Sequence, residues 1–442
     1  MKTPICDFVK AYAESKAIKL HMPGHKGKGE LGFESLDITE IDGADSLYEA
    51  SGIIAESERN ASAIFGCDTY YSTEGSSQCI RAMMYLVSLA AKSRGEKPYV
   101  LAGRNAHKTF HSAVALLDID VDWIYPKTSE NYLSCNISAE KLAEAFKKSH
   151  KKPTVVYLTS PDYLGNVLDI ASISRVCREN GVLLAVDNAH GAYLKFLTPS
   201  KHPINLGADI CCDSAHKTLP VLTGGAYLHL SSSFASEIGD CVKNALVLFG
   251  STSPSYLILQ SLDAANDYLE NYPERLRAFV SNVDLLKGRL IETGYELYGN
   301  EALKITLKTK KYGYLGYDFA KILNEKGIVC EFCDPDFVVL MLTPEIENLR
   351  EVEEILLSIE KREPINVFAP NFKRLERATS IREAVLSPSE CLDVDKCLGR
   401  VVAMASVGCP PAVPVSVAGE IVDENALECF RYYGIEKINV IK

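Results

Sequence analysis

Short apolar runs and amphipathic stretches alternate along the middle of the chain, from about residue 61 to residue 290. Apolar runs of strand length occupy residues 98–102, 154–159, 182–187, 208–213 and 225–230. Between them, apolar positions repeat with helical spacing over residues 76–92, 138–148 and 170–180. Buried strands that alternate with helices are typical of a parallel sheet covered on both faces. The pattern therefore predicts a large α/β domain.

The pattern changes on both sides of this region. Residues 1–60 contain few periodic elements and several glycines, which indicates an arm that packs on another part of the protein. A long helical pattern leads into a mixed region, for which we expect, in order, a helix over 255–292, a strand pair at 328–342, helices at 345–361 and 380–390, and a proline-rich loop at 409–414. We predict three parts: an arm (1–60), a large domain (61–295) and a smaller C-terminal α+β domain (296–442).

The composition excludes several classes of protein. Of the 442 residues, 47% are hydrophobic and 24% are charged, as in an ordinary globular protein. The net charge of -11 argues against non-specific binding to nucleic acid, which requires a basic surface. No apolar run reaches the roughly 18 residues of a membrane span, and the first residues lack a signal-peptide pattern. We interpret the 14 cysteines as reduced thiols and expect a cytoplasmic protein.

The strongest chemical signal is the segment 213–218, DSAHKT, directly after the apolar run 208–213. A lysine just past the end of a buried parallel strand lies where open α/β sheets bind ligands. A desolvated amine loses its proton more readily, and Schiff-base chemistry with an aldehyde needs the neutral amine. Ser214 and His216 add a hydroxyl and a titratable ring beside Lys217. The segment predicts a reactive lysine.

A second signal is Asp187, which ends the apolar run 182–187. A carboxylate in this position must be paired or hydrogen-bonded, because a lone buried charge is very costly. A protonated pyridine nitrogen is a suitable partner, and such a pairing keeps a pyridine cofactor an effective electron sink. An N-cap or a salt bridge is the alternative interpretation.

The segment 73–78, TEGSSQ, joins a strand-like run at 69–72 to a helical pattern. Glycine followed by hydroxyl residues at a helix N-terminus forms an anion site from backbone amides and side-chain donors. Ser76 and Ser77 are therefore candidates to hold a phosphate. A simple serine N-cap is the alternative.

Histidines and cysteines elsewhere could suggest a metal, but we predict none. The segment 104–111, RNAHKTFH, has two histidines four residues apart without the glutamate of an H-E-x-x-H motif. The imidazole of His107 could instead stack on an aromatic cofactor ring, or be structural. Cys330 and Cys333 form a C-x-x-C without a second pair at zinc spacing, so we expect no metal or redox use there.

The four signals occur in order, each after a predicted strand of one sheet, and together they carry a family resemblance. The chain resembles the ornithine/lysine/arginine decarboxylase family of fold-type I pyridoxal-phosphate enzymes, in a short form without an N-terminal wing domain. The matching segments are 21–27 (HMPGHKG), 104–108 (RNAHK), 186–191 (VDNAHG), 214–219 (SAHKTL), 251–256 (STSPSY), 410–414 (PPAVP) and 419–420 (GE). The resemblance implies an aspartate-aminotransferase-like large domain with a mixed, mostly parallel sheet, and a smaller α+β domain.

The resemblance also implies roles for single residues. Lys217 would form the Schiff base with pyridoxal 5'-phosphate, Asp187 would pair with the pyridine nitrogen, and His216 would lie beside the reacting centre. The ring would lie between His107 and Ala189. The phosphate would be held by Ser76, Ser77 and Ser214, with Thr252 and its neighbours 251–253 reaching the phosphate of the partner in a homodimer with shared active sites. His190 and Glu420 would meet the substrate.

The activity implied is a lyase that decarboxylates lysine, ornithine or arginine through a quinonoid to an amine used in polyamine biosynthesis. Lys217 or His216 would return the proton to Cα. Other fold-type I chemistry, such as that of an aminotransferase or another lyase, stays open, and an inert regulatory homologue is a further alternative. An aminotransferase would need an arginine for the substrate carboxylate, and the candidates are Arg374, Arg377, Arg382 and Arg400.

Two departures from the family pattern leave the substrate open. The phosphate turn has Glu74 where an Asn-Gly-Ser-Thr type of run is more usual, which places a negative charge close to the expected phosphate. The residues before Glu420 are Val417-Ala418-Gly419 where Pro-Gly-Glu is usual.

Overall fold

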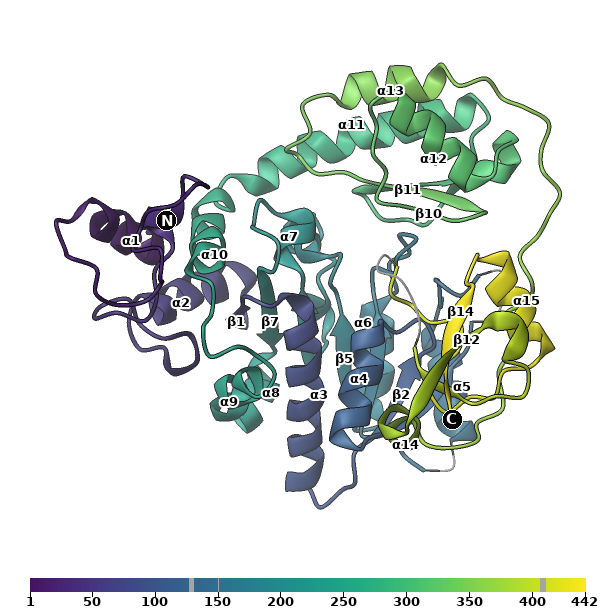
Figure 1. The fold of residues 1–442 in the computed structure, drawn as a ribbon, viewed down its shortest axis with the longest axis horizontal. Coiled ribbons are helices and arrows are strands. Elements are labelled where there is room, and N and C mark those ends of the chain that lie inside the picture. The colour runs from purple at the N-terminus through teal and green to yellow at the C-terminus, as the bar shows by residue number, and fades with distance from the viewer. Residues whose placement is uncertain (127–130, 150, 406–410) are drawn as a thin grey trace. The chain divides into compact units, whose positions relative to one another are not determined.

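A computed structural model describes residues 1–126, 131–149, 151–405 and 411–442 of the chain. The chain divides into two compact units, each made of two segments. The first unit comprises Met1–Pro98 and Cys177–Leu276, and the second comprises Tyr99–Val176 and Arg277–Lys442 (Figure 1). The division into an arm and two domains stays a prediction. Cys409 and Pro410 of the predicted proline-rich loop lie outside the described residues.

The first unit is built around four strands in the order β1-β7-β6-β5. They are β1 (Asp68–Ser72), β5 (Leu183–Asp187), β6 (Ile210–Asp213) and β7 (Ala226–Leu230). Strands β5 and β6 are parallel, whereas β7 is antiparallel to both β6 and β1. The helices are α1 (Pro4–Glu14), α2 (Ile53–Phe65), α3 (Gly75–Ser93), α7 (Ala215–Thr218), α8 (Ser232–Ile238), α9 (Val242–Val247) and α10 (Tyr256–Tyr268).

The second unit contains three groups of strands. Parallel strands β2 (Tyr99–Gly103), β3 (Asp120–Ile124) and β4 (Val155–Thr159) lie in the order β4-β2-β3. An antiparallel sheet has the order β10-β11-β9-β8, with β8 (Leu297–Tyr298), β9 (Lys304–Lys308), β10 (Phe332–Cys333) and β11 (Phe337–Met341). A third sheet, β12-β14-β13, joins β12 (Ser389–Asp393), β14 (Lys437–Ile441) and β13 (Val402–Met404).

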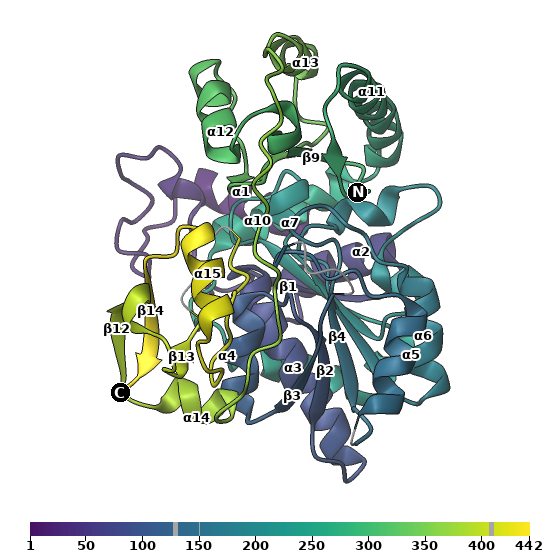
Figure 2. The same cartoon turned by 90° about the vertical axis from the view of Figure 1, so that its right-hand side faces the viewer.

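Helices cover the sheets of the second unit, as Figure 2 shows for α12 beside the four-stranded sheet and α15 beside β14. They are α4 (Lys108–Leu117), α5 (Ala139–Lys148), α12 (Gly316–Glu325), α13 (Leu349–Leu357), α14 (Ile381–Leu386) and α15 (Glu424–Tyr432). Helices α6 (Ile170–Glu179) and α11 (Tyr272–Glu292) each contain a boundary between the segments of the two units. None of the helices in the described ranges has the length and apolar character needed to cross a bilayer.

Two of the predicted helices have the wrong bounds, and a proline explains each difference. The helix expected over 255–292 is two helices, because α10 ends at Tyr268 and α11 begins at Tyr272, next to Pro273. Proline has no backbone N–H and disfavours a helical residue before it, so it fits the first turn of a helix and not the interior. The helix expected over 380–390 ends at Leu386, since Pro388 precedes β12.

The N-terminal segment is more regular than its sequence suggests. Helix α1 begins with Pro4, and its first amides, those of Ile5 and Cys6, donate to the carboxylate of Asp263 on α10 at 2.9 and 3.0 Å. A carboxylate at a helix N-terminus satisfies amides that have no partner within the helix. The same carboxylate accepts a hydrogen bond from Ser57 on α2 at 2.6 Å. One buried aspartate thus fastens α1 to the rest of the first unit.

Candidate active site

The reactive lysine predicted from the sequence lies on the short helix α7, directly after β6. Its Nζ lies 2.9 Å from Nε2 of His190, which follows the neighbouring parallel strand β5. Parallel strands end at the same edge of a sheet, so the loops after β5 and β6 are adjacent. Backbone bonds join them, from Ser214 N to Ala189 O at 3.3 Å and from Asn188 N to Cys212 O at 3.0 Å.

Asp187 occupies the predicted place at the end of β5 and is only 2% exposed. Its Oδ1 accepts a hydrogen bond from the amide of Ala189 at 3.2 Å, and the thiol of Cys212 lies 3.8 Å away. Ala189 is itself buried. A buried carboxylate at this edge is chemically suited to a protonated ring nitrogen, which would give it a charged partner.

Hydroxyl groups gather at the N-terminus of α3. Ser76 lies in the first turn of this helix, and its hydroxyl accepts a hydrogen bond from Ser214 Oγ at 2.8 Å. Ser77 follows it in the same turn. The amides of a helix N-terminus and several hydroxyls form a suitable cradle for a phosphate. The structure thus brings together two of the hydroxyl groups that are predicted to bind the phosphate, from positions 138 residues apart in the sequence.

The charge of Glu74 has a partner that the sequence does not reveal. Its carboxylate accepts a hydrogen bond from the backbone amide of Ser251. Glu74 therefore anchors the segment 251–253, in which Thr252 is exposed. The unusual acid in the phosphate turn positions a loop that the family resemblance also assigns to the cofactor.

Asp213 is the residue at this edge that sequence reasoning misses. It is fully buried, and its Oδ1 accepts a hydrogen bond from the side-chain amide of Asn188 at 2.6 Å. Its Oδ2 accepts hydrogen bonds from Nε2 of His202 at 3.1 Å and of His229 at 3.2 Å. Burial acts to raise the pKa of Asp213, but the two imidazoles outweigh it and hold this pKa well below its usual range. Asp213 therefore fixes the loop after β5 against the start of α7.

The same cluster offers ligand atoms for a metal. His202, Cys211 and Asp213 have ligand atoms within 4.8 Å of one another. The contacts from both imidazoles to Asp213 have ordinary hydrogen-bond lengths. Hydrogen bonding is therefore sufficient to explain this arrangement.

His216 has a different environment from His190. Its Nδ1 donates to the carbonyl of Gly225 at 3.0 Å. Burial lowers the pKa of His216, although the bond to Gly225 acts to raise it. His216 is thus a neutral, oriented imidazole next to Lys217 in the sequence.

Two predicted site residues belong to the second unit. His107 is the N-cap of α4, where its Nδ1 accepts a hydrogen bond from the amide of Thr109 at 3.1 Å. Glu420 is 4% exposed and forms an ion pair with the buried Arg104 at 3.3 Å. The amide of Val417 donates to the same carboxylate at 2.8 Å. The roles of His107 and Glu420 towards cofactor and substrate stay predictions.

Arg104 organises the surroundings of Glu420. Its guanidinium donates to the carbonyls of Pro414 and Val415 at 3.0 and 2.9 Å. It also lies over the rings of Trp123 and Phe372, 5.6 and 5.1 Å from their centroids. A guanidinium is well suited to combined hydrogen bonding and ring stacking. Burial raises the pKa of Glu420, and Arg104 opposes that rise.

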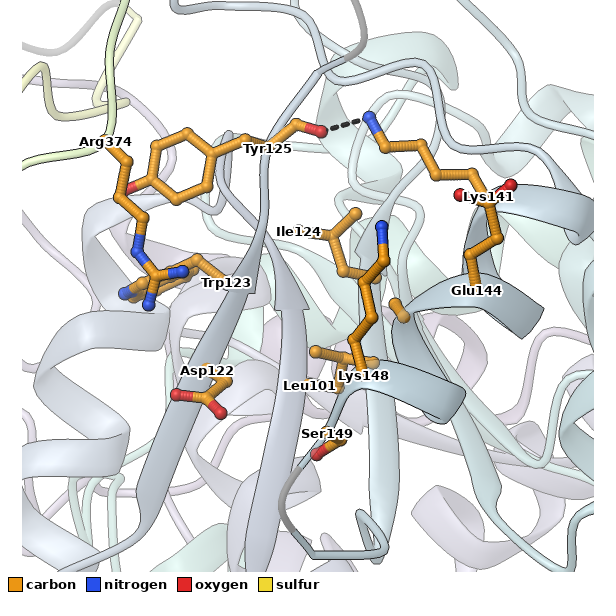
Figure 3. A pocket seen from close by; sticks show the side chains of 11 residues that line it. Leu101, Asp122, Trp123, Ile124, Tyr125, Lys141, Glu144, Lys148, Ser149 and Arg374 are labelled. Carbon is orange, nitrogen blue, oxygen red and sulfur yellow. Dashed lines mark hydrogen bonds between the residues drawn. The ribbon is translucent and has the colours of Figure 1, made fainter.

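A surface pocket of about 250 Å³ lies beside this cluster within the second unit. Figure 3 shows Arg374 next to Trp123 and Tyr125, with Lys141 bonded to the carbonyl of Tyr125. Of the four arginines considered for an aminotransferase, Arg374 lines this pocket. The others bind groups of the chain itself: Arg377 the carbonyl of Val121, Arg382 that of Ala115, and Arg400 the carboxylate of Glu390.

In the C-x-x-C motif, Cys333 ends β10 and Cys330 lies two residues before that strand, and both are half-buried free thiols. Their side chains interact, and the hydrogen bond from Cys333 lowers the pKa of Cys330 to about 7. The two thiols therefore influence each other, although no ligand for them follows from this contact.

Comparison with known proteins decides the family. Residues 3–284 match the family model described as the major domain of Orn/Lys/Arg decarboxylases. The chain belongs to this family. Its predicted membership is confirmed, and with it the assignment of the chain as a decarboxylase.

Individual relatives match over nearly the whole chain. An uncharacterized protein, YaaO, of Bacillus subtilis is 28% identical, over 97% of this chain and 93% of its own length. An arginine decarboxylase of Halalkalibacterium halodurans is 27% identical, over the same shares of the two chains. Among solved structures, the lysine decarboxylase LdcF of Francisella novicida has a TM-score of 0.81 at 16% identity, over all of this chain and 81% of that one. The predicted fold class, a fold-type I α/β fold with a mixed, mostly parallel sheet, is confirmed, and the structure adds smaller antiparallel sheets.

Proposed function

We propose that the protein decarboxylates a basic amino acid, lysine, ornithine or arginine, with pyridoxal 5'-phosphate bound covalently to Lys217. The observation that carries this proposal is the contact of Lys217 Nζ with His190 at the edge that also holds Asp187 and the paired hydroxyls of Ser76 and Ser214. An amine, a buried carboxylate and hydroxyls at a helix N-terminus fit the aldehyde, ring nitrogen and phosphate of this cofactor. Because the relative from Halalkalibacterium halodurans is named an arginine decarboxylase, arginine is the first substrate to test.

Each residue then has a definite task. Asp187 would hold the proton of the ring nitrogen, and Ser76, Ser77 and Ser214 would bind the phosphate. As the family resemblance implies, His107 and Ala189 would contact the ring. When bound, pyridoxal phosphate accepts the electron pair of the bond to the substrate carboxylate. Lys217 or His216 delivers a proton to the substrate Cα.

The substrate side of the proposal involves His190 and Glu420. A distal ammonium or guanidinium group would have to share Glu420 with Arg104, which already pairs with it. We further propose a cytoplasmic homodimer in which Thr252 contributes to the site of the partner. Glu74 supports that role, since it anchors the segment that contains Thr252.

Product analysis by mass spectrometry tests the proposal. The pyridoxal-phosphate-loaded protein is incubated separately with arginine, lysine, ornithine and diaminopimelate. We expect agmatine, cadaverine or putrescine from a basic amino acid. Lysine from diaminopimelate would show decarboxylation of another substrate, and a keto acid would indicate an aminotransferase instead.

The variant Lys217→Ala examines the covalent attachment. We expect it to lose both the Schiff-base absorbance and turnover, because no other group would hold the aldehyde. Lys201→Ala, at an exposed lysine of the same unit, is the matched control and should keep both. Turnover retained by Lys217→Ala would refute the assignment.

A further inference from the structure

Two histidines are neighbours of Lys217: His190 lies next to it in the fold, and His216 precedes it in the sequence. Their side chains form hydrogen bonds with different groups. Nε2 of His190 lies 2.9 Å from Lys217 Nζ. His216, the immediate neighbour of Lys217, uses Nδ1 to bind the carbonyl of Gly225. The residue in hydrogen-bond contact with the amine thus comes from the loop after β5, and it is 5% exposed.

We propose that His190 takes the proton from Lys217 and so makes its amine nucleophilic, an inference that rests on the proposed function of Lys217. An unperturbed lysine has a pKa of about 10.4 and is almost wholly protonated at pH 7. A neutral imidazole offers one bare nitrogen as a proton acceptor. The 2.9 Å contact places that acceptor within reach of the amine.

The atoms and electrons of this step balance. An ammonium N–H bond of Lys217 breaks, its electron pair stays on Nζ, and the proton bonds to Nε2 of His190. The pair on Nζ then forms the C–N bond to the aldehyde carbon, while the π pair of the C=O bond moves to the oxygen. That oxygen takes a second proton from Nζ and becomes a hydroxyl. The imidazolium of His190 gives its proton to this hydroxyl, the C–O bond breaks, and water leaves with the electron pair of that bond. The pair left on Nζ by the second proton forms the C=N bond, and the imidazole is neutral again.

The surrounding charges are compatible with a proton that moves back and forth. Asp187 lies three residues before His190, and its carboxylate is turned to the amide of Ala189. Asp213 reaches this loop through Asn188, with its own charge engaged by His202 and His229. His216 is held neutral by burial. His190 is therefore placed within hydrogen-bond distance of the amine and can exchange a proton with it.

The experiment measures how fast the full-length protein, freed of pyridoxal phosphate, recaptures it at different pH values. Schiff-base absorbance gives the rate, and borohydride reduction followed by peptide mass spectrometry shows whether Lys217 is the residue labelled. His190→Gln keeps a polar group of similar size but cannot titrate. His216→Gln tests the neighbouring histidine, the exposed Lys201→Ala is the control outside the site, and circular dichroism checks that each variant is folded.

We expect His190→Gln to slow capture roughly tenfold or more at pH 7, as for loss of a general base. The pH of half-maximal rate should move upward, and the deficit should disappear at alkaline pH, where lysine is neutral without help. Added imidazole should restore the rate of His190→Ala in proportion to its concentration. Lys201→Ala should keep the wild-type rate and pH profile.

Other outcomes overturn the inference. A rate lowered equally at every pH would mean that His190 only shapes the site. An upward shift in His216→Gln and none in His190→Gln would assign the role to the other histidine. If borohydride labels a lysine other than Lys217, the proposed function itself fails. Labelling of Lys217 with an unmoved pH profile contradicts the role of His190 alone.

Discussion

The two units each bury a carboxylate near predicted site residues, and they stabilise it in opposite ways. Asp213, in the first unit, accepts three hydrogen bonds, from the side chains of Asn188, His202 and His229, and its pKa is lowered. Glu420, in the second unit, has the guanidinium of Arg104 at 3.3 Å and the amide of Val417, yet its pKa is raised. Two histidines outweigh the effect of burial on the pKa of Asp213, whereas the single guanidinium of Arg104 does not offset burial at Glu420.

The difference matters for what each region can do. Asp213 stays ionised, so it can lock the loops that carry His190 and Lys217 in one arrangement. Glu420 can accept a proton at lower cost, so the Arg104 cluster can change its charge. We expect the first region to behave as a rigid support and the second as a pair whose strength depends on pH.

Removal of Asp213 should have the largest effect on stability. Asp213→Ala leaves three buried donors without an acceptor, and we expect a loss of about 3–5 kcal/mol in the free energy of unfolding. Urea unfolding measures it, with the exposed Asp240→Ala as control. Recapture of pyridoxal phosphate should also weaken. A loss below that of the control would show that the imidazoles do not need this carboxylate.

Removal of Arg104 should cost less, because Glu420 can become protonated. For Arg104→Met we expect a loss of about 2–4 kcal/mol at pH 8 and a smaller loss at pH 5. An acid whose folded-state pKa is raised binds more protons when folded, so stability decreases as pH rises above its unfolded pKa. Unfolding at both pH values measures this change. A loss independent of pH would mean that Glu420 is not the group left unpaired.

For Asp213, we expect stability to depend on pH in the opposite direction, so that it decreases on acidification. A carboxylate with a lowered folded-state pKa contributes stability that is fully present above its unfolded pKa, near 3.8, and is lost as pH falls through the folded value. The stability advantage of wild type over Asp213→Asn should therefore shrink below about pH 4. Unfolding titrations between pH 2 and 6 test this. A stability difference between wild type and Asp213→Asn that does not change with pH would mean that Asp213 does not titrate in this range.

Much of the fold and part of the site can be predicted from the sequence. Strands such as β7 are buried along their whole length, so their apolar runs stand out. Strand β12 has the sequence SECLD and a largely exposed pattern, and no apolar signal marks it. Asp187 is predictable because it ends an apolar run, and Lys217 because it follows one closely. The partners of Asp213 are not, since His202 and His229 lie 11 and 16 residues away and only the folded chain brings them together.

Arg374 should show the smallest effect and sharpens the contrast with Arg104. Both arginines lie beside Trp123, but Arg374 is exposed and lines the pocket of Figure 3. For Arg374→Ala we expect a change in the free energy of unfolding within about 0.5 kcal/mol. Urea unfolding beside Arg104→Met measures it. A larger loss would show that the surface arginine also supports the cluster.

Trp123 is the single tryptophan of the chain, and it packs against the guanidinium of Arg104 in the second unit. Its fluorescence therefore reports on that unit alone. The absorbance of a cofactor held by Lys217 would report on the first unit. Tryptophan fluorescence and cofactor absorbance can thus follow the two units separately in one unfolding experiment, without any added label.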